Sequence, residues 1–287
     1  MDTKLKRWTQ LGLGAAFATS ALAACGGETA PTETAAPEAA APETVADAPD
    51  MTDPAPAASA GEGEGEGGEG EGGVAVSAAA SNPVVYMSAL AITEAHIIAA
   101  RDAFAAGETE AASEMFAHPV SEVLADMGPV FEQRGVESFS QLLLDASGAI
   151  FDGEDEAQIN ARADEILAAI AAAGEKAPDD GSSQATIAAG VAADQIERAT
   201  DMYRTAAGTD RYEPYLDGYG FFKAGEAAFL ASEAAIDAEN SDTAGAIRAA
   251  LGLLDGAYPT ALRPAMLDAD QSALTVAASE VVLAVQN

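Results

Sequence analysis

Residues 184–207 read Gln-Ala-Thr-Ile-Ala-Ala-Gly-Val-Ala-Ala-Asp-Gln-Ile-Glu-Arg-Ala-Thr-Asp-Met-Tyr-Arg-Thr-Ala-Ala, which is the longest helical pattern in the chain. Large apolar residues are spaced among alanines at Ile187, Val191, Ile196 and Tyr203. Alanine is the strongest helix former, whereas the β-branched and aromatic residues that favour strands are few. This stretch therefore predicts a helix and sets the fold class as all-α.

The segments on both sides repeat this pattern, with short polar or glycine breaks between them. Short connections make neighbouring helices pack antiparallel. We expect a helical bundle of about eight helices, and an up-and-down bundle and a pair of stacked helical hairpins both fit. The domain is predicted over residues 83–287, with helices at 87–104, 109–116, 118–135, 138–151, 154–173, 184–207, 215–239 and 243–257 and a last one that ends near 285.

The first 24 residues have the pattern of an export signal. Lys4, Lys6 and Arg7 form a positive start, and the apolar stretch after them is shorter than the roughly 20 residues that a membrane-spanning helix needs. The stretch ends in Leu22-Ala23-Ala24-Cys25, which resembles the lipobox of bacterial lipoproteins. Residues 1–24 are therefore predicted to be a signal peptide.

The lipobox resemblance implies that the chain is cut before Cys25 and anchored to a membrane by acyl groups, palmitate among them, on that residue. Cys25 is the only cysteine, so a disulfide within the chain or a thiolate metal cluster is excluded. The residue after it is Gly26 rather than Asp, and by resemblance to Gram-negative sorting this predicts the cell outer membrane, facing the periplasm.

Residues 25–82 join the lipidated cysteine to the domain and consist mostly of Ala, Pro, Glu, Thr and Gly, with a Gly-Glu repeat at 61–73. This composition buries too little apolar surface to fold, so the segment is predicted to be a disordered linker. As a flexible coil it would reach roughly 40 Å.

The formal net charge of the chain is −34. Such a charge repels the phosphate backbone, so nucleic acid is excluded as a partner. Two interpretations of the charge stay open: a cationic partner, or solubility alone.

Two histidines with nearby carboxylates are the candidate metal ligands. His118 and Glu122 are four residues apart, so they share a helix face, and Asp126 lies one turn further. His96 projects from a face of small residues, and it would join them if the two helices pack together. Imidazole and carboxylate groups suit iron, zinc or copper. The alternative is that the histidines cap a helix or fill the core.

Residues 210–222 hold three of the six tyrosines, with several carboxylates among them. Tyrosine serves recognition well because one end is apolar and the other forms hydrogen bonds. Tyr212, Tyr215 and Tyr219 are therefore a candidate surface for a protein partner. The alternative is that these aromatics cover the end of the bundle.

Motifs of hydrolases, nucleotide-binding enzymes and zinc peptidases are absent, so we predict that the protein is not an enzyme. The Ala-rich helical domain with His and Glu on one helix loosely resembles the imelysin-like group of envelope proteins, which are linked to iron uptake. That group has a His-x-x-Glu motif, whereas His118 and Glu122 have three residues between them. The resemblance implies metal handling and gives no support for peptidase activity.

The sequence therefore predicts a lipid-anchored envelope protein with a helical ligand-binding domain that takes a transition-metal cation. A structural or protein-interaction module of the envelope without a ligand is the alternative. A carrier of lipid or another hydrophobic molecule between the helices is a third hypothesis.

Overall fold

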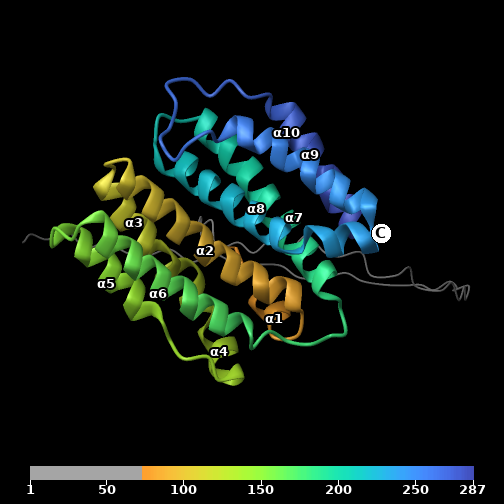
Figure 1. The fold of residues 1–287 in the computed structure, drawn as a ribbon, viewed down its shortest axis with the longest axis horizontal. Helices are drawn as coiled ribbons and strands as arrows, with labels where there is room; N and C mark the ends of the chain where they lie inside the picture. The colour runs from red at the N-terminus through yellow and green to blue at the C-terminus, as the bar shows by residue number, and fades with distance from the viewer. Residues whose placement is uncertain (1–72) are drawn as a thin grey trace, which may run out of the picture. The chain divides into compact units, whose positions relative to one another are not determined.

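The computed structural model describes residues 73–287, which are helical and contain no strand, so the all-α prediction is confirmed (Figure 1). The predicted signal peptide, Cys25 and most of the predicted linker lie outside these residues. The helices are α1 (Val76–Ala79), α2 (Pro83–Ala105), α3 (Thr109–Pro119), the π-helical turn η1 (Val120–Leu124), α4 (Ala125–Arg134), α5 (Ser140–Phe151), α6 (Glu156–Gly174), α7 (Gln184–Ala207), α8 (Glu213–Glu239), α9 (Ser241–Ala257) and α10 (Gln271–Val285).

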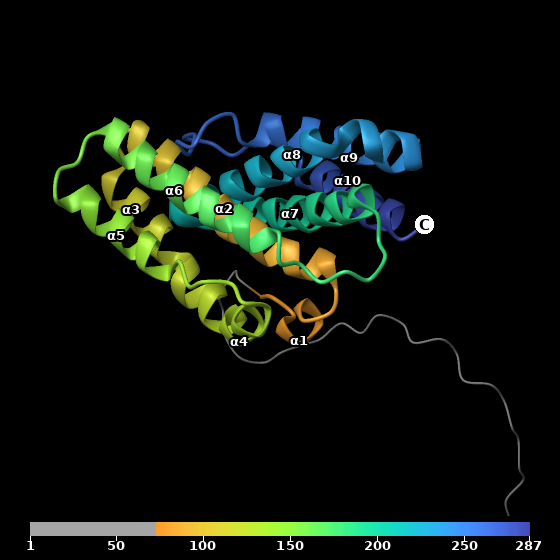
Figure 2. The same cartoon turned by 60° about the horizontal axis from the view of Figure 1, so that its bottom comes forward.

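The long helices form two bundles of four, which meet at one interface, called the seam below. In the first bundle α2 packs on α3 and α6, and α5 packs on the same two helices from the other side. In the second bundle α7, α8, α9 and α10 contact one another in the same way. Helix α2 also packs along α7 and α8, so it belongs to both bundles (Figures 1 and 2). The seam between α2 and α8 is where the candidate site lies.

Side-chain caps begin several of the helices. The side chain of Asn82 accepts hydrogen bonds from the backbone N–H groups of Val84 and Val85, and Pro83 occupies the first turn of α2, where no donor is needed. The Asn240 side chain accepts in the same way at the start of α9. Helix α7 has the predicted bounds.

The prediction that His118-Pro119 begins a helix is wrong. Helix α3 continues to Pro119, and η1 follows without a break before α4 begins. Proline has no N–H to donate, and the next turn is wound more widely, with the Ala125 N–H bonded to the carbonyl of Val120 five residues back. Such π-helical turns often occur at functional sites. Here the turn carries Glu122.

Residues 73–82, which the sequence analysis assigned to the linker, include the short helix α1. Ala79 is fully buried, and the Arg134 Nη2 group donates a hydrogen bond of 2.8 Å to the Ala80 carbonyl oxygen. The part of the linker nearest the domain therefore packs on it.

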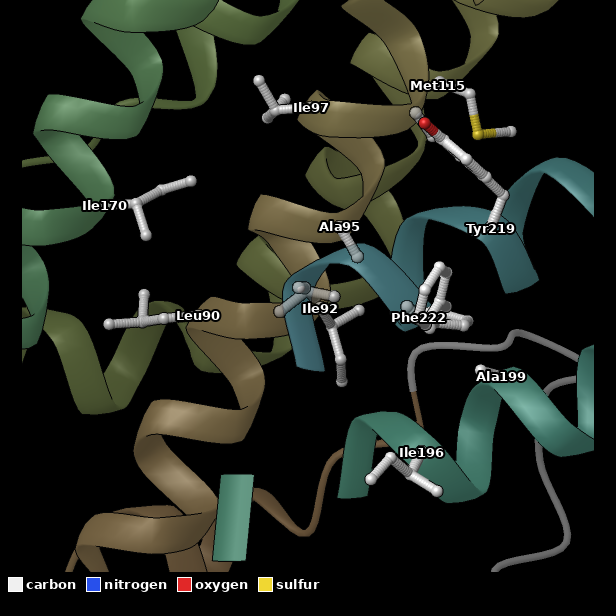
Figure 3. Packing of buried hydrophobic residues seen from close by; sticks show 14 of the residues in the cluster. Leu90, Ile92, Ala95, Ile97, Met115, Ile170, Ile196, Ala199, Tyr219 and Phe222 are labelled. Carbon is white, nitrogen blue, oxygen red and sulfur yellow. The ribbon is translucent and has the colours of Figure 1, made fainter. Parts of the chain in front are cut away.

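Opposite faces of α2 fill the cores of the two bundles. Leu90 and Ile97 point toward Ile170 of α6, whereas Ile92 and Ala95 lie toward Phe222 of α8 (Figure 3). Many contact positions are alanine, which lets the helix axes approach closely while aromatic side chains fill the remaining space.

Helix α2 is long and apolar enough to cross a membrane, and it is the one such helix in residues 73–287. Most of it is buried against other helices, as expected of a central core helix.

Candidate metal centre

Four polar side chains from both bundles meet at the seam. His96 comes from α2, His118 from the last turn of α3, Glu122 from η1 and Asp217 from α8. One donor atom from each of His96, His118 and Asp217 can be chosen so that all three lie within 4.8 Å of one another. This convergence brings together three residues that the sequence analysis named and one that it did not.

His96 is the best-defined member of the group. Its side chain is 1% exposed, and its Nδ1 atom lies 2.8 Å from the carbonyl oxygen of Ile92. Because a carbonyl only accepts, Nδ1 carries the proton and the lone pair of the neutral ring is on Nε2. That Nε2 atom lies 3.5 Å from Glu122 Oε2 and 3.8 Å from Asp217 Oδ1. Metal-bound histidines are oriented by this kind of backbone hydrogen bond.

Burial lowers the pKa of His96 to about 4, against an opposing effect of the Ile92 hydrogen bond. The nearby His118 ring and the Arg198 guanidinium also lower it. The His96 ring is therefore neutral at pH 7, as a metal ligand must be. Its edge-on neighbour is the Phe221 ring, with centroids 5.8 Å apart.

His118 and Glu122 form the partly open side of the site. Both side chains are about one-fifth exposed, and His118 Nδ1 lies 3.9 Å from Glu122 Oε1. The two imidazole rings face each other edge to face at 6.0 Å between centroids. An ion could therefore reach the buried donors from this side.

The structure places Asp126 away from the site. Asp126 is exposed. Helix α4, which carries it, packs on α1 and η1 and leaves the seam, so the Asp126 carboxylate lies outside the site. The prediction of Asp126 as a ligand is therefore not supported by its position.

Asp217 lies at the site instead, and the sequence analysis did not name it among the candidate ligands. It is 2% exposed, and it is the one acidic residue in the apolar run 214–222 at the start of α8. The sequence feature that could have identified Asp217 is that it is a single acidic residue inside an apolar helix segment. Buried carboxylates are rare without a specific role.

The donor set has the chemistry of a transition-metal site. His96 Nε2 and His118 Nδ1 are both buried and form no hydrogen bond with any residue in 73–287. An ion with donor bonds of about 2.0–2.2 Å holds neighbouring donors roughly 3–4 Å apart. The observed separations of 3.5–3.9 Å between a ring nitrogen and a carboxylate oxygen match this spacing.

The candidate partner surface is internal. Tyr215 is fully buried and Tyr219 is 7% exposed, and their hydroxyls donate to the Thr260 carbonyl oxygen and to Asp102 Oδ2 at 2.8 and 2.7 Å. The half-buried Tyr212 donates to the Ala261 carbonyl oxygen at 2.8 Å. The aromatic segment therefore packs inside the second bundle and against α2, which gives it a packing role.

No protein-family model, curated protein or solved structure matches this chain.

Proposed function

We propose that this chain is a lipid-anchored envelope protein whose helical domain binds one divalent transition-metal cation at the seam between its bundles. His96, His118 and Asp217 are the ligands, with Glu122 as a fourth donor from the partly exposed side. The observation that carries the proposal is the geometry of His96, whose backbone hydrogen bond aims a neutral, buried Nε2 at two carboxylates.

Electrostatics support an ion at this position. Asp217 brings a carboxylate into a buried seam beside an imidazole that burial keeps neutral. A divalent cation between the rings would attract the carboxylates of Asp217 and Glu122 and would use both nitrogen lone pairs.

The mixture of donors favours some metals over others. Two imidazoles with one or two carboxylates suit Zn²⁺, Fe²⁺ and Cu²⁺, whereas Mg²⁺ and Ca²⁺ favour oxygen ligands. The loose imelysin-like character of the domain favours iron among these. We propose a binding role for the site without an enzymatic reaction.

The competing proposal is a structural or interaction module, in which the four side chains only fill the seam. The two proposals differ in the effect of a metal ion on the stability of the folded domain. A ligand that binds only the folded state stabilises it by RT ln(1 + [L]/Kd), or about 2.7 kcal/mol at a hundredfold excess over Kd. A module without a ligand gains no stability from added metal.

The test is a metal titration of residues 26–287, which contain the whole helical domain at 73–287. The protein carries no histidine tag and is stripped with a chelator. We expect one Zn²⁺, Fe²⁺ or Cu²⁺ per chain by calorimetry, little response to Mg²⁺ or Ca²⁺, and loss of binding in His96→Ala and His118→Ala. Absence of stoichiometric binding, or its persistence in both variants, would overturn the proposal.

A further inference from the structure

A cleft of about 930 Å³ lies between α2, α6, α7 and α8, and none of the four residues of the candidate metal centre lines it. Its volume falls within the roughly 300–1,000 Å³ that ligand sites of small molecules occupy. The cleft is therefore a second candidate binding site.

The inner wall of the cleft is largely apolar. It is lined by Met87, Leu90 and Ala91 of α2, by Ile170 of α6, and by Ile187 and Val191 of α7. Small alanines of α8, among them Ala228, leave the space open on the fourth side. A hydrocarbon chain would bury apolar area against these walls, which is favourable.

The charges that line the cleft all have one sign. Glu94, Glu175, Asp179 and Asp180 are among its lining residues, which include no Lys, Arg or His. Glu94 follows Met87, Leu90 and Ala91 on one face of α2, so its carboxyl lies beside the apolar wall. Within residues 73–287 its half-buried side chain has no ion pair or hydrogen bond.

We propose that this cleft binds an apolar organic cation, that is, an amphiphilic amine. Its hydrocarbon part packs between α2, α6 and α7, and its ammonium group pairs with Glu94. A fatty acid or another anionic amphiphile would place its negative charge beside four carboxylates. A neutral ligand would cover Glu94 without giving its charge a partner, which costs free energy.

The experiment compares three probes of the same chain length on residues 26–287: n-octylammonium, 1-octanol and n-octanoate. Calorimetry at physiological salt limits non-specific attraction to the acidic surface. We expect one octylammonium per chain, at least tenfold weaker binding of octanol, and no binding of octanoate. Octylammonium bound no more tightly than octanol, or any binding of octanoate, would overturn the proposal.

Two pairs of variants test whether the probe binds in the cleft. Glu94→Gln should weaken octylammonium binding at least tenfold without weakening octanol binding, whereas Glu114→Gln, at an exposed position of α3, should change neither. Ala228→Trp should block both probes, whereas Ala235→Trp, at an exposed position of α8 outside the cleft, should block neither. Circular dichroism confirms that each variant is folded. Octylammonium binding that survives both Glu94→Gln and Ala228→Trp would contradict the assignment.

Discussion

Gly220 of α8 lies directly against the backbone of Ala95 of α2, so that a Cβ atom at Gly220 would be 2.4 Å from the Ala95 carbonyl oxygen. Ala95 precedes His96, and Gly220 follows Asp217 by three residues. Only a residue without a side chain permits this approach, because real Cβ atoms essentially never come within 3.0 Å of another heavy atom. The contact therefore sets how near the carboxylate of α8 comes to the imidazole of α2.

Gly220→Ala should push α8 away from α2 and widen the metal centre. We expect a loss of about 1–3 kcal/mol in the free energy of unfolding, as for other overpacked interiors, together with weaker metal binding. Urea denaturation and a metal titration measure the two effects. Gly245→Ala on α9 is the matched control, because nothing lies within 4 Å of its Cβ and alanine favours the helix. Equal stability of the two variants would contradict the account.

The structure indicates Asp217 as a ligand, whereas the sequence indicated Asp126. Exchanging each carboxylate for an amide distinguishes the two. Asp217→Asn removes a charged donor at the seam, so it should weaken metal binding at least tenfold. Asp126→Asn makes the same chemical change at an exposed position and should leave the affinity unchanged. Calorimetric titration of both variants gives the answer, and a loss of affinity in Asp126→Asn alone would restore the ligand set expected from the sequence.

Helix positions were predictable because local signals decide them. The alanine-rich run at 184–207 depends on residues close together in the sequence, and α7 has the predicted bounds. The start expected at His118 failed because proline, common in first turns, here lies inside a continuous helical segment. A proline alone does not distinguish these two cases.

The sequence predicts those neighbours in the candidate site that lie on one helix, but not the contacts that depend on how distant helices pack. His118 and Glu122 are neighbours through helix periodicity, which the sequence displays. Their meeting with His96 was expected on the condition that their helices pack together, and α2 and α3 do so. Asp217 is about 100 residues further along the chain, and its approach depends on the packing of α8 on α2, which no local pattern encodes.

Alkaline pH should unfold the domain cooperatively. Burial raises the pKa of Tyr212 to about 12, and the pKa values of Tyr215, Tyr219 and Tyr258 also lie above the ordinary value of 10.0. Since the unfolded state loses these protons first, the stability that they contribute is complete below about pH 10 and decreases above it. Tyrosinate absorbance should therefore rise together with the loss of helical circular dichroism. Titration of most tyrosines near pH 10 with the helices intact would contradict the burial described.

Cys25→Ser tests the membrane anchor separately from the domain. The change removes the only thiol that could be acylated, so the protein should move from the detergent phase to the aqueous phase in a detergent partition of cells that express the full chain. Metabolic labelling with a fatty acid should be lost as well. Metal binding should not change, because Cys25 has no part in the donor set. A Cys25→Ser protein that stays in the membrane would show that the anchor lies elsewhere.

The most direct test of the metal centre is anomalous diffraction from a crystal of residues 26–287 loaded with Zn²⁺. We predict one strong anomalous peak at the seam, about 2.0–2.2 Å from His96 Nε2 and at similar distances from His118 and Asp217. A crystal in which zinc lies only on the acidic surface, with no peak among these three residues, would contradict the proposal.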